Sequence, residues 1–199
     1  LKEVFPLIKA NKMWVGTTSF NKDMLFISPE EVDPTKKPSS ATRTVNGVVY
    51  LRSPSVWYSN LDHGRRHQPL PLMTMQDNIK FSKHKEIKGK EYQKFDNYDA
   101  INIPFTDAIP SDYDGAMAVP ISFLDKYSPD QFEILGTSDN GLVDDKYKKT
   151  LGLKKQFVDD YYKGGGTGAY KEGNPTAGFY ENGIAKMAYK RIFIKHQKK

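Results

Sequence analysis

The spacing of apolar residues over the first sixty positions predicts one short helix followed by several short strands. Residues 1–10 carry apolar side chains three and four positions apart, which is the spacing of one face of a helix. Residues 12–16 and 24–28 contain short apolar runs typical of strands. The dipeptide Asn46-Gly47 favours the tight turn of a β-hairpin and precedes the apolar run 48–52, so we expect a hairpin there.

Beyond residue 64 the pattern predicts mostly strands joined by turns. Two prolines hold residues 69–73 extended. Residues 147–162 set apolar and aromatic side chains among lysines and aspartates, which predicts a helix, and the glycines of 164–168 predict a flexible linker after it. Further strands are expected at residues 100–105, 116–124, 132–136 and 187–194. This mixture indicates an α/β protein, or α+β if the chain is taken alone.

Composition narrows the class of protein. The 199 residues correspond to about one domain or slightly more, and the 13% of aromatic residues supply a core that a disordered chain lacks. No apolar run is long enough to span a membrane. The absence of cysteine excludes disulfides, zinc–thiolate sites and thiol catalysis, and it fits a reducing cytoplasm. The chain does not start with Met, which we take as a sign of a longer protein.

The net charge of +6 is divided into blocks of opposite sign. Residues 80–94 carry a net charge of +4, residues 95–114 a net charge of −5, and residues 186–199 a net charge of +6. Basic blocks attract polyanions through counterion release, so nucleic acid is the favoured partner. The alternative is that each block is only a solvated face. No block has the Trp- and Leu-rich face of a membrane-surface helix.

The densest polar cluster is Asn60-Leu-Asp-His-Gly-Arg-Arg-His67, and it allows three interpretations. The first is a metal-dependent nuclease, in which Asp62 orients His63 and a later Asn78 and His84 hold a metal, although no clear helix fixes their spacing. The second is a structural turn. The third is a contact site for phosphates and base edges, in which the two arginines are bidentate donors.

Several segments resemble the adenine-specific DNA methyltransferases of the EcoRI-methylase type. The resemblance is continuous from about Leu1 to Gly136, resumes at residues 189–195, and is lost over 137–182. It includes Val56-Trp-Tyr-Ser-Asn-Leu-Asp-His-Gly-Arg-Arg-His67. Its other segments are residues 72–78, 83–92, 97–101, 107–115 and 119–134.

The resemblance implies a cytoplasmic restriction-modification enzyme that transfers a methyl group from S-adenosylmethionine to adenine in duplex DNA. Its Rossmann-like core would carry a glycine-bearing cofactor loop and an Asn-Pro-Pro-Phe motif, and this sequence has neither. We therefore expect the C-terminal part of such an enzyme, inactive by itself, with the cofactor bound by the missing N-terminal part. Residues 1–62 would close the core with a helix and strands, and residues 63–199 would form a strand- and loop-rich target-recognition region. No catalytic or metal-binding residue is assigned to this part.

Base flipping requires a separate part that grips the DNA backbone and reads sequence. The acidic stretch 95–114 should face away from phosphates, or accept from cytosine amino groups. Trp14 and Phe26 are candidates for stacking on the flipped base, with core packing as the alternative. A stand-alone DNA-binding module and the nuclease that uses His63 remain the other functional hypotheses. The expected DNA-binding residues are Arg65, Arg66, His67, Lys80, Lys83, Lys85, Lys88, Lys90 and Lys94.

Overall fold

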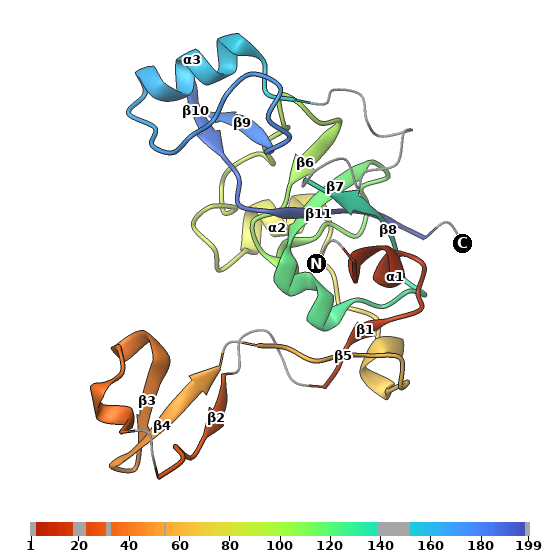
Figure 1. The fold of residues 1–199 in the computed structure, drawn as a ribbon. Coiled ribbons are helices and arrows are strands. Elements are labelled where there is room, and N and C mark those ends of the chain that lie inside the picture. The colour runs from red at the N-terminus through yellow and green to blue at the C-terminus, as the bar shows by residue number, and fades with distance from the viewer. Residues whose placement is uncertain (1–2, 18–22, 31–32, 54, 139–151, 198–199) are drawn as a thin grey trace.

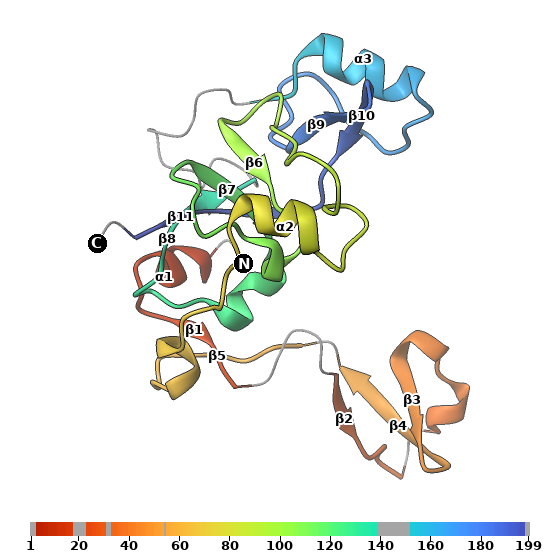
Figure 2. The ribbon, with the colours of Figure 1, turned by 180° about the vertical axis from the view of Figure 1, so that it is seen from behind.

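The structure consists of a central body, a projecting β-ribbon arm and a small lobe (Figure 1). It is a computed structural model that describes residues 3–17, 23–30, 33–53, 55–138 and 152–197. Figures 1 and 2 place the arm and the lobe at opposite ends of the body. The fold is mixed, with several small sheets and few helices, which is consistent with an α+β protein.

A four-stranded sheet in the order β6-β7-β11-β8 forms the centre of the body. Strands β6 (Ala100–Asn102) and β7 (Ala116–Pro120) are parallel. Strand β11 (Arg191–His196) is antiparallel to β7 and to β8 (Phe132–Thr137). Successive residues of β11 enter different apolar clusters, because side chains of a strand alternate between the two faces of the sheet. The sheet is therefore covered on both faces.

The predicted N-terminal helix is confirmed as α1 (Phe5–Lys9), and it packs on one face of the sheet. The 3-10 helix η5 (Ile121–Lys126) contributes Phe123 to the same cluster. Strand β1 (Trp14–Val15) pairs with β5 (Tyr58–Ser59) and buries its valine in that cluster too. Residues 5–15 thus share one core with the C-terminal strand β11.

The arm is a three-stranded antiparallel sheet in the order β2-β4-β3. Its strands are β2 (Met24–Phe26), β3 (Thr42–Val45) and β4 (Val48–Ser53). The predicted hairpin is confirmed, because Asn46 and Gly47 have φ angles of 49° and 81°, as a type I′ turn requires. Two 3-10 helices precede β3, namely η1 (Pro34–Lys36) and η2 (Ser39–Ala41).

The lobe consists of helix α3 (Lys155–Lys163) packed on the hairpin β9 (Gly178–Glu181) and β10 (Ile184–Met187). The helix was expected over 147–162. Residues 147–150 and Leu151 lie outside the described residues, and the helix begins only at Lys155. Because Leu153 is buried in the lobe before the helix starts, the apolar pattern extends beyond the helix itself.

Helix α2 (Met75–Phe81) was not predicted by the apolar pattern. A local cap defines its start: the Thr74 hydroxyl accepts from the Asp77 amide at 3.1 Å and donates to the Asp77 carboxylate at 2.8 Å. Two further 3-10 helices complete the body, η3 (Gly64–His67) and η4 (Thr106–Ala108).

Several of the expected strands end differently in the structure, and the strand expected over 100–105 stops at Asn102. The strand expected over 116–124 stops at Pro120, where the chain turns into η5. The strand expected over 187–194 is two strands, since β10 ends at Met187 and β11 starts at Arg191. Among the described residues, no helix has the length and apolarity that a bilayer crossing requires.

Candidate nucleic-acid interface

The lysine segment, residues 80–94, runs from the last turns of α2 to the edge of the sheet, and all six of its lysines are exposed. Ile87 is buried at its centre, and the Gly89 amide donates to the Ile79 carbonyl at 2.8 Å. These contacts hold the backbone against the body while the lysine side chains point to water. The segment is thus an anchored loop with an exposed positive charge.

Only two lysines of the segment form ion pairs with described residues. Lys83 lies 2.8 Å from Asp107, and Lys90 lies 3.8 Å from Glu181. Within the described ranges, the other four lysines have no carboxylate within salt-bridge distance, and of these Lys80 lies 5.0 Å from the centroid of the Phe81 ring. Lys85, Lys88 and Lys94, which contact neither a described carboxylate nor a described aromatic ring, can therefore contact phosphates without first breaking an internal interaction.

The acidic stretch 95–114 is not simply turned away from the lysines. Three of its carboxylates are bound by other groups of the protein. Asp96 pairs with Lys154, and Asp112 accepts from the Met75 amide at the start of α2. Burial opposes ionisation of Asp107, but hydrogen bonds from Lys83 and His84 outweigh it and hold the pKa of this carboxyl below its ordinary value. These contacts reduce the repulsion that the stretch would exert on a nearby phosphate.

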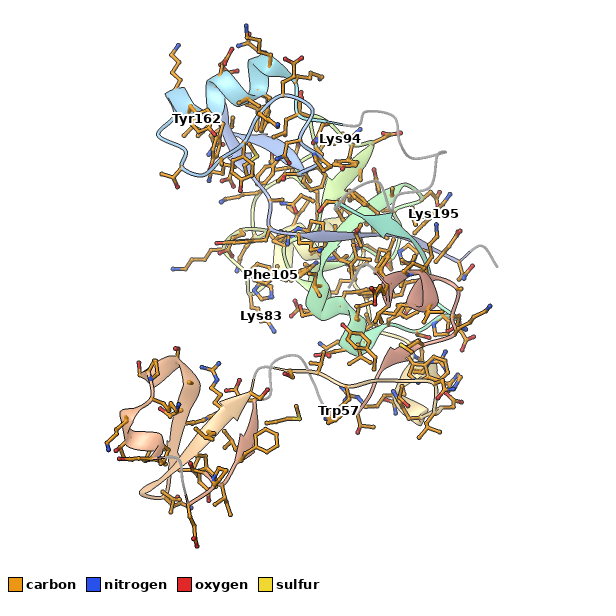
Figure 3. All side chains as sticks on the ribbon, in the orientation of Figure 1. Trp57, Lys83, Lys94, Phe105, Tyr162 and Lys195 are labelled. Atoms are coloured by element: carbon orange, nitrogen blue, oxygen red, sulfur yellow. The ribbon has the colours of Figure 1, made fainter. Side chains whose placement is uncertain are left out.

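An aromatic stack borders the lysine segment. The rings of His84 and Phe105 lie 3.7 Å apart and 7° from parallel, and the Nε2 atom of His84 lies 2.9 Å from Asp107. Figure 3 shows Phe105 beside Lys83 on the side of the body where the arm projects. No sequence signal indicated this stack, because its two rings come from separate segments. Aromatic faces beside cations are suited to contact with nucleic acid.

The structure does not bring the arginines of η3 together with the lysine segment. In Figures 1 and 2, η3 lies beside β5 below the sheet, away from the lysine loop. Arg65 is exposed and donates to the Thr17 carbonyl at 2.7 Å. Arg66 is buried: it donates to Asp62 at 2.8 Å and to Asn11 at 2.5 Å, and it lies 3.4 Å above the Trp14 ring.

Trp14 and Phe26, the two stacking candidates, differ in what surrounds them. The indole N–H of Trp14 donates to the Leu61 carbonyl at 2.8 Å, and the guanidinium of Arg66 covers one face of its ring. Phe26 lies in the arm and is exposed. Trp14 therefore serves as a platform for Arg66 inside the body, whereas the Phe26 ring is accessible.

The described residues do not adopt the arrangement that the nuclease interpretation requires. His63 places Nε2 3.0 Å from the Val15 carbonyl, and Asp62 interacts with Arg66 and His67 instead of orienting His63. Asn78 is buried in α2. The described residues contain no group of three or more histidine, aspartate or glutamate side chains that could hold a metal ion.

The pKa of His67 lies above the ordinary value of a histidine, because hydrogen bonds from its ring to Asp62 and then to Asp130 raise it. The same contacts lower the pKa of Asp62 to about 2, with His67 as the largest cause and Arg66 next. The contribution of protonated His67 to the free energy of unfolding is fully present below the pKa of His67 in the unfolded chain. It is lost as the pH rises through the higher pKa of the folded state. Stability from ionised Asp62 is present above its unfolded pKa and is lost as pH falls towards about 2.

An NMR titration of the His67 ring protons checks this expectation. The pKa should lie above 6.5 in the wild type and should fall in Asp130→Asn, which removes one of the two carboxylates. A wild-type value at or below 6.5 would show that these contacts do not persist in solution.

Comparison with known proteins shows to which protein family the chain belongs. The model of a family described as adenine-specific methyltransferase EcoRI matches residues 1–197, including the stretch 137–182 where the resemblance was lost in the sequence alone. No solved structure matches the chain.

Three curated relatives are similar to the chain. Type II methyltransferase M.EcoRI of Escherichia coli is 40% identical over 138 residues, which are 67% of this chain and 38% of the relative. M.MgeORF184P of Mycoplasma genitalium is 37% identical over 133 residues, 66% of this chain and 39% of the relative. M.MpnI of Mycoplasma pneumoniae is 33% identical over 141 residues, 67% of this chain and 39% of the relative. The chain thus spans about two fifths of the length of these relatives, and it belongs to the EcoRI family of adenine-specific methyltransferases.

Proposed function

We propose that this chain is the C-terminal part of a cytoplasmic, site-specific DNA adenine-N6 methyltransferase of a restriction-modification system, and that this part binds and reads duplex DNA. The family match over residues 1–197 supports the enzyme class. The observation that carries the DNA-binding role is the anchored lysine segment, in which Lys85, Lys88 and Lys94 have no ion pair with a described residue. Exposed lysines of this kind bind backbone phosphates.

S-adenosylmethionine would be bound by the part of the enzyme that lies outside this chain, because the described residues do not fit it. A cofactor loop of the Rossmann type follows a strand and opens a helix. The glycines of 164–168 instead follow helix α3, and the carbonyls of Thr167 and Gly168 accept from the hydroxyls of Tyr161 and Tyr162.

Residues 1–62 would close the catalytic core and residues 63–199 would form the target-recognition region. The burial of Phe5, Ile8 and Val15 against the central sheet supports a rigid connection between the two. Arg65, exposed on η3, is a second candidate contact with the backbone, separate from the lysine segment. A stand-alone DNA-binding module would use the same surface, and an Asn-Pro-Pro-Phe motif encoded upstream of Leu1 would decide for the methyltransferase.

The salt dependence of DNA binding tests the proposal. We expect fluorescence anisotropy with a duplex of about 20 base pairs to show log K falling linearly with log [KCl] between about 50 and 200 mM. Lys85, Lys88 and Lys94 alone should contribute a slope of about −3, since each phosphate contact contributes about −0.9. An affinity that does not change with salt would contradict the proposal.

A further inference from the structure

Arg191, the first residue of β11, is an arginine that the fold buries without a carboxylate partner among the residues that the structure describes. Arg191 is 9% exposed, and its Nε donates to the side-chain oxygen of Asn102, in β6 of the same sheet, at 3.2 Å. Its backbone amide donates to the Ser138 hydroxyl at 2.9 Å. Among the described residues, no aspartate or glutamate lies within salt-bridge distance of the guanidinium.

A largely buried guanidinium with no counter-charge among the described residues is costly, and a ligand that accepts from its remaining donors would offset that cost. Burial lowers the pKa of Arg191, as expected when a cation is withdrawn from water, although arginine still stays protonated near neutral pH. Only Nε has a described side-chain acceptor, so the two terminal nitrogens keep their donor capacity. A ligand with two neighbouring acceptors would satisfy this fork.

Arg191 lines a cavity of about 240 Å³ between the lysine segment and the hairpin of the lobe. Its walls include the aromatic rings of Tyr92, Phe179 and Tyr189, which offer flat surfaces, and the flexible apolar side chain of Met187. The volume is below the roughly 300–1,000 Å³ of pockets for drug-sized ligands, so it suits a single planar ring system. The cavity is therefore small and mostly lined by apolar surface, and Arg191 supplies a polar group at one point of its wall.

The charges around the cavity favour a neutral ligand over a phosphate. Glu86, Glu91 and Glu181 line it together with Lys186, which pairs with Glu181. Glu86 and Glu91 have no ion pair with a described residue, so they would repel a phosphate and could accept from N–H groups. Guanine combines two acceptors on one edge with N–H donors on another.

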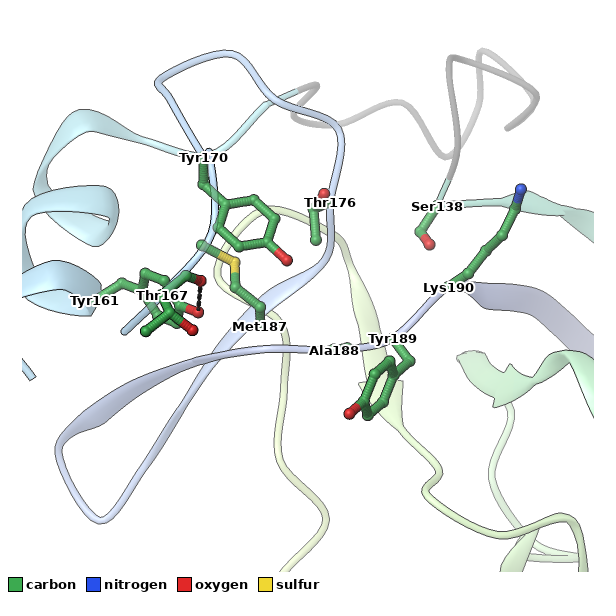
Figure 4. Close-up of a pocket in the computed structure, with 9 residues that line it drawn as sticks. All are labelled: Ser138, Tyr161, Thr167, Tyr170, Thr176, Met187, Ala188, Tyr189 and Lys190. Atoms are coloured by element: carbon green, nitrogen blue, oxygen red, sulfur yellow. Dashed lines mark hydrogen bonds between the residues drawn. The ribbon is translucent and has the colours of Figure 1, made fainter. Parts of the chain in front are cut away.

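Tyr189 adds an exposed aromatic surface at the cavity. The residue is 88% exposed in the connection between β10 and β11, which is unusual for a tyrosine outside an interface. It also lines a second cavity of about 470 Å³, with Tyr161, Tyr170 and Lys190 (Figure 4). An aromatic ring in this position can stack on a base that enters from the solvent.

We infer that the Arg191 cavity binds a guanine base that has left the DNA stack. The guanidinium donates to O6 and N7, carboxylates at the rim accept from the N–H groups, and Tyr189 stacks on the ring. A base within an intact duplex cannot be read here, because a buried arginine cannot reach into a groove, so the guanine must be extrahelical. This inference rests on the proposed function, since it assigns a base contact to the same DNA-binding part.

Duplexes with one unpaired base test the inference against the proposed function. Four probes share their flanking sequence and contain an unpaired guanine, an unpaired adenine, an unpaired cytosine or no unpaired base. We expect the wild-type chain to bind the guanine probe about 10-fold more tightly than the adenine and cytosine probes, as a bidentate arginine contact implies. Equal affinity for the three unpaired bases would overturn the inference and leave DNA binding intact. Failure to bind even the fully paired probe would overturn the proposed function as well.

Two variants assign the guanine preference to the cavity. Tyr189→Ala removes an exposed ring, and Arg191→Lys keeps the charge while removing the fork. We expect both to lose most of the guanine preference and to bind the fully paired duplex like the wild type. Ile184→Ala is the control, because Ile184 is exposed on β10 and does not line the cavity. Thermal unfolding identifies any folding defect in Arg191→Lys; in that case Tyr189→Ala decides, and a preserved guanine preference in it would overturn the inference.

Discussion

Replacing Arg66 with alanine is expected to lower the free energy of unfolding by about 2 kcal/mol. The Arg66 side chain is 8% exposed, so its contacts are formed largely away from water. The substitution removes the bonds to Asp62 and Asn11 and the stacking of the guanidinium on Trp14 at 3.4 Å. The loss is below that expected for a fully buried ion pair, because Asp62 is partly exposed and can return to water.

Urea denaturation followed by circular dichroism measures this loss. Arg65→Ala is the matched control, since Arg65 is the exposed neighbour, and its unfolding free energy should stay within about 0.5 kcal/mol of the wild type. We expect Arg65→Ala to reduce DNA affinity instead. If Arg66→Ala unfolded at the wild-type urea concentration, Arg66 would not hold η3 to the N-terminal segment.

The different roles of these two arginines could not be predicted from their adjacent positions. Both are equally able to bind phosphate or a base edge, and the sequence around them is uniformly polar. Their difference depends on Asn11 and Trp14, which lie about fifty residues earlier and meet Arg66 only in the folded chain. Long-range packing of this kind leaves no local pattern.

Elements with a local signal were predicted well. The turn at Asn46-Gly47 needs positive φ angles that Asn and Gly tolerate, so its hairpin is confirmed. The second hairpin, between β9 and β10, has the same dipeptide at Asn182-Gly183 with φ angles of 51° and 78°, and this signal was overlooked. Helix α2 was missed because it is short and carries only one apolar pair at helical spacing, Met75 and Ile79, so its cap at Thr74 is its clearest signal.

The candidate site was predictable only in its exposed parts. The run of lysines at residues 80–94 predicts a basic block, but the sequence did not indicate that the buried Ile87 anchors its backbone. Nothing in the sequence indicated that Arg191 is buried. Arg191 stands at the start of the apolar run that forms β11, and a basic residue at the end of a strand is ordinarily expected to be exposed. Its partner Asn102 lies in β6, which the sheet topology brings close.

Replacing Lys85, Lys88 and Lys94 together with alanine is expected to remove about three phosphate contacts from the DNA complex. All three side chains are exposed, and none has an ion pair with a described residue, so the fold should be unaffected. Each phosphate contact contributes about 0.9 to the slope of log K against log [salt], so the slope should become less steep by about 3. Lys83 and Lys90 are kept, because their ion pairs with Asp107 and Glu181 would complicate the comparison.

The salt slope of this triple variant is the most direct test of the claim that the lysine segment binds DNA. A control triple variant replaces Lys155, Lys163 and Lys171, which are exposed on or near helix α3, so that both variants lose the same net charge. We predict a slope about 3 less steep for the lysine-segment variant and an unchanged slope for the control. Equal slopes for the wild type and both variants would contradict the account.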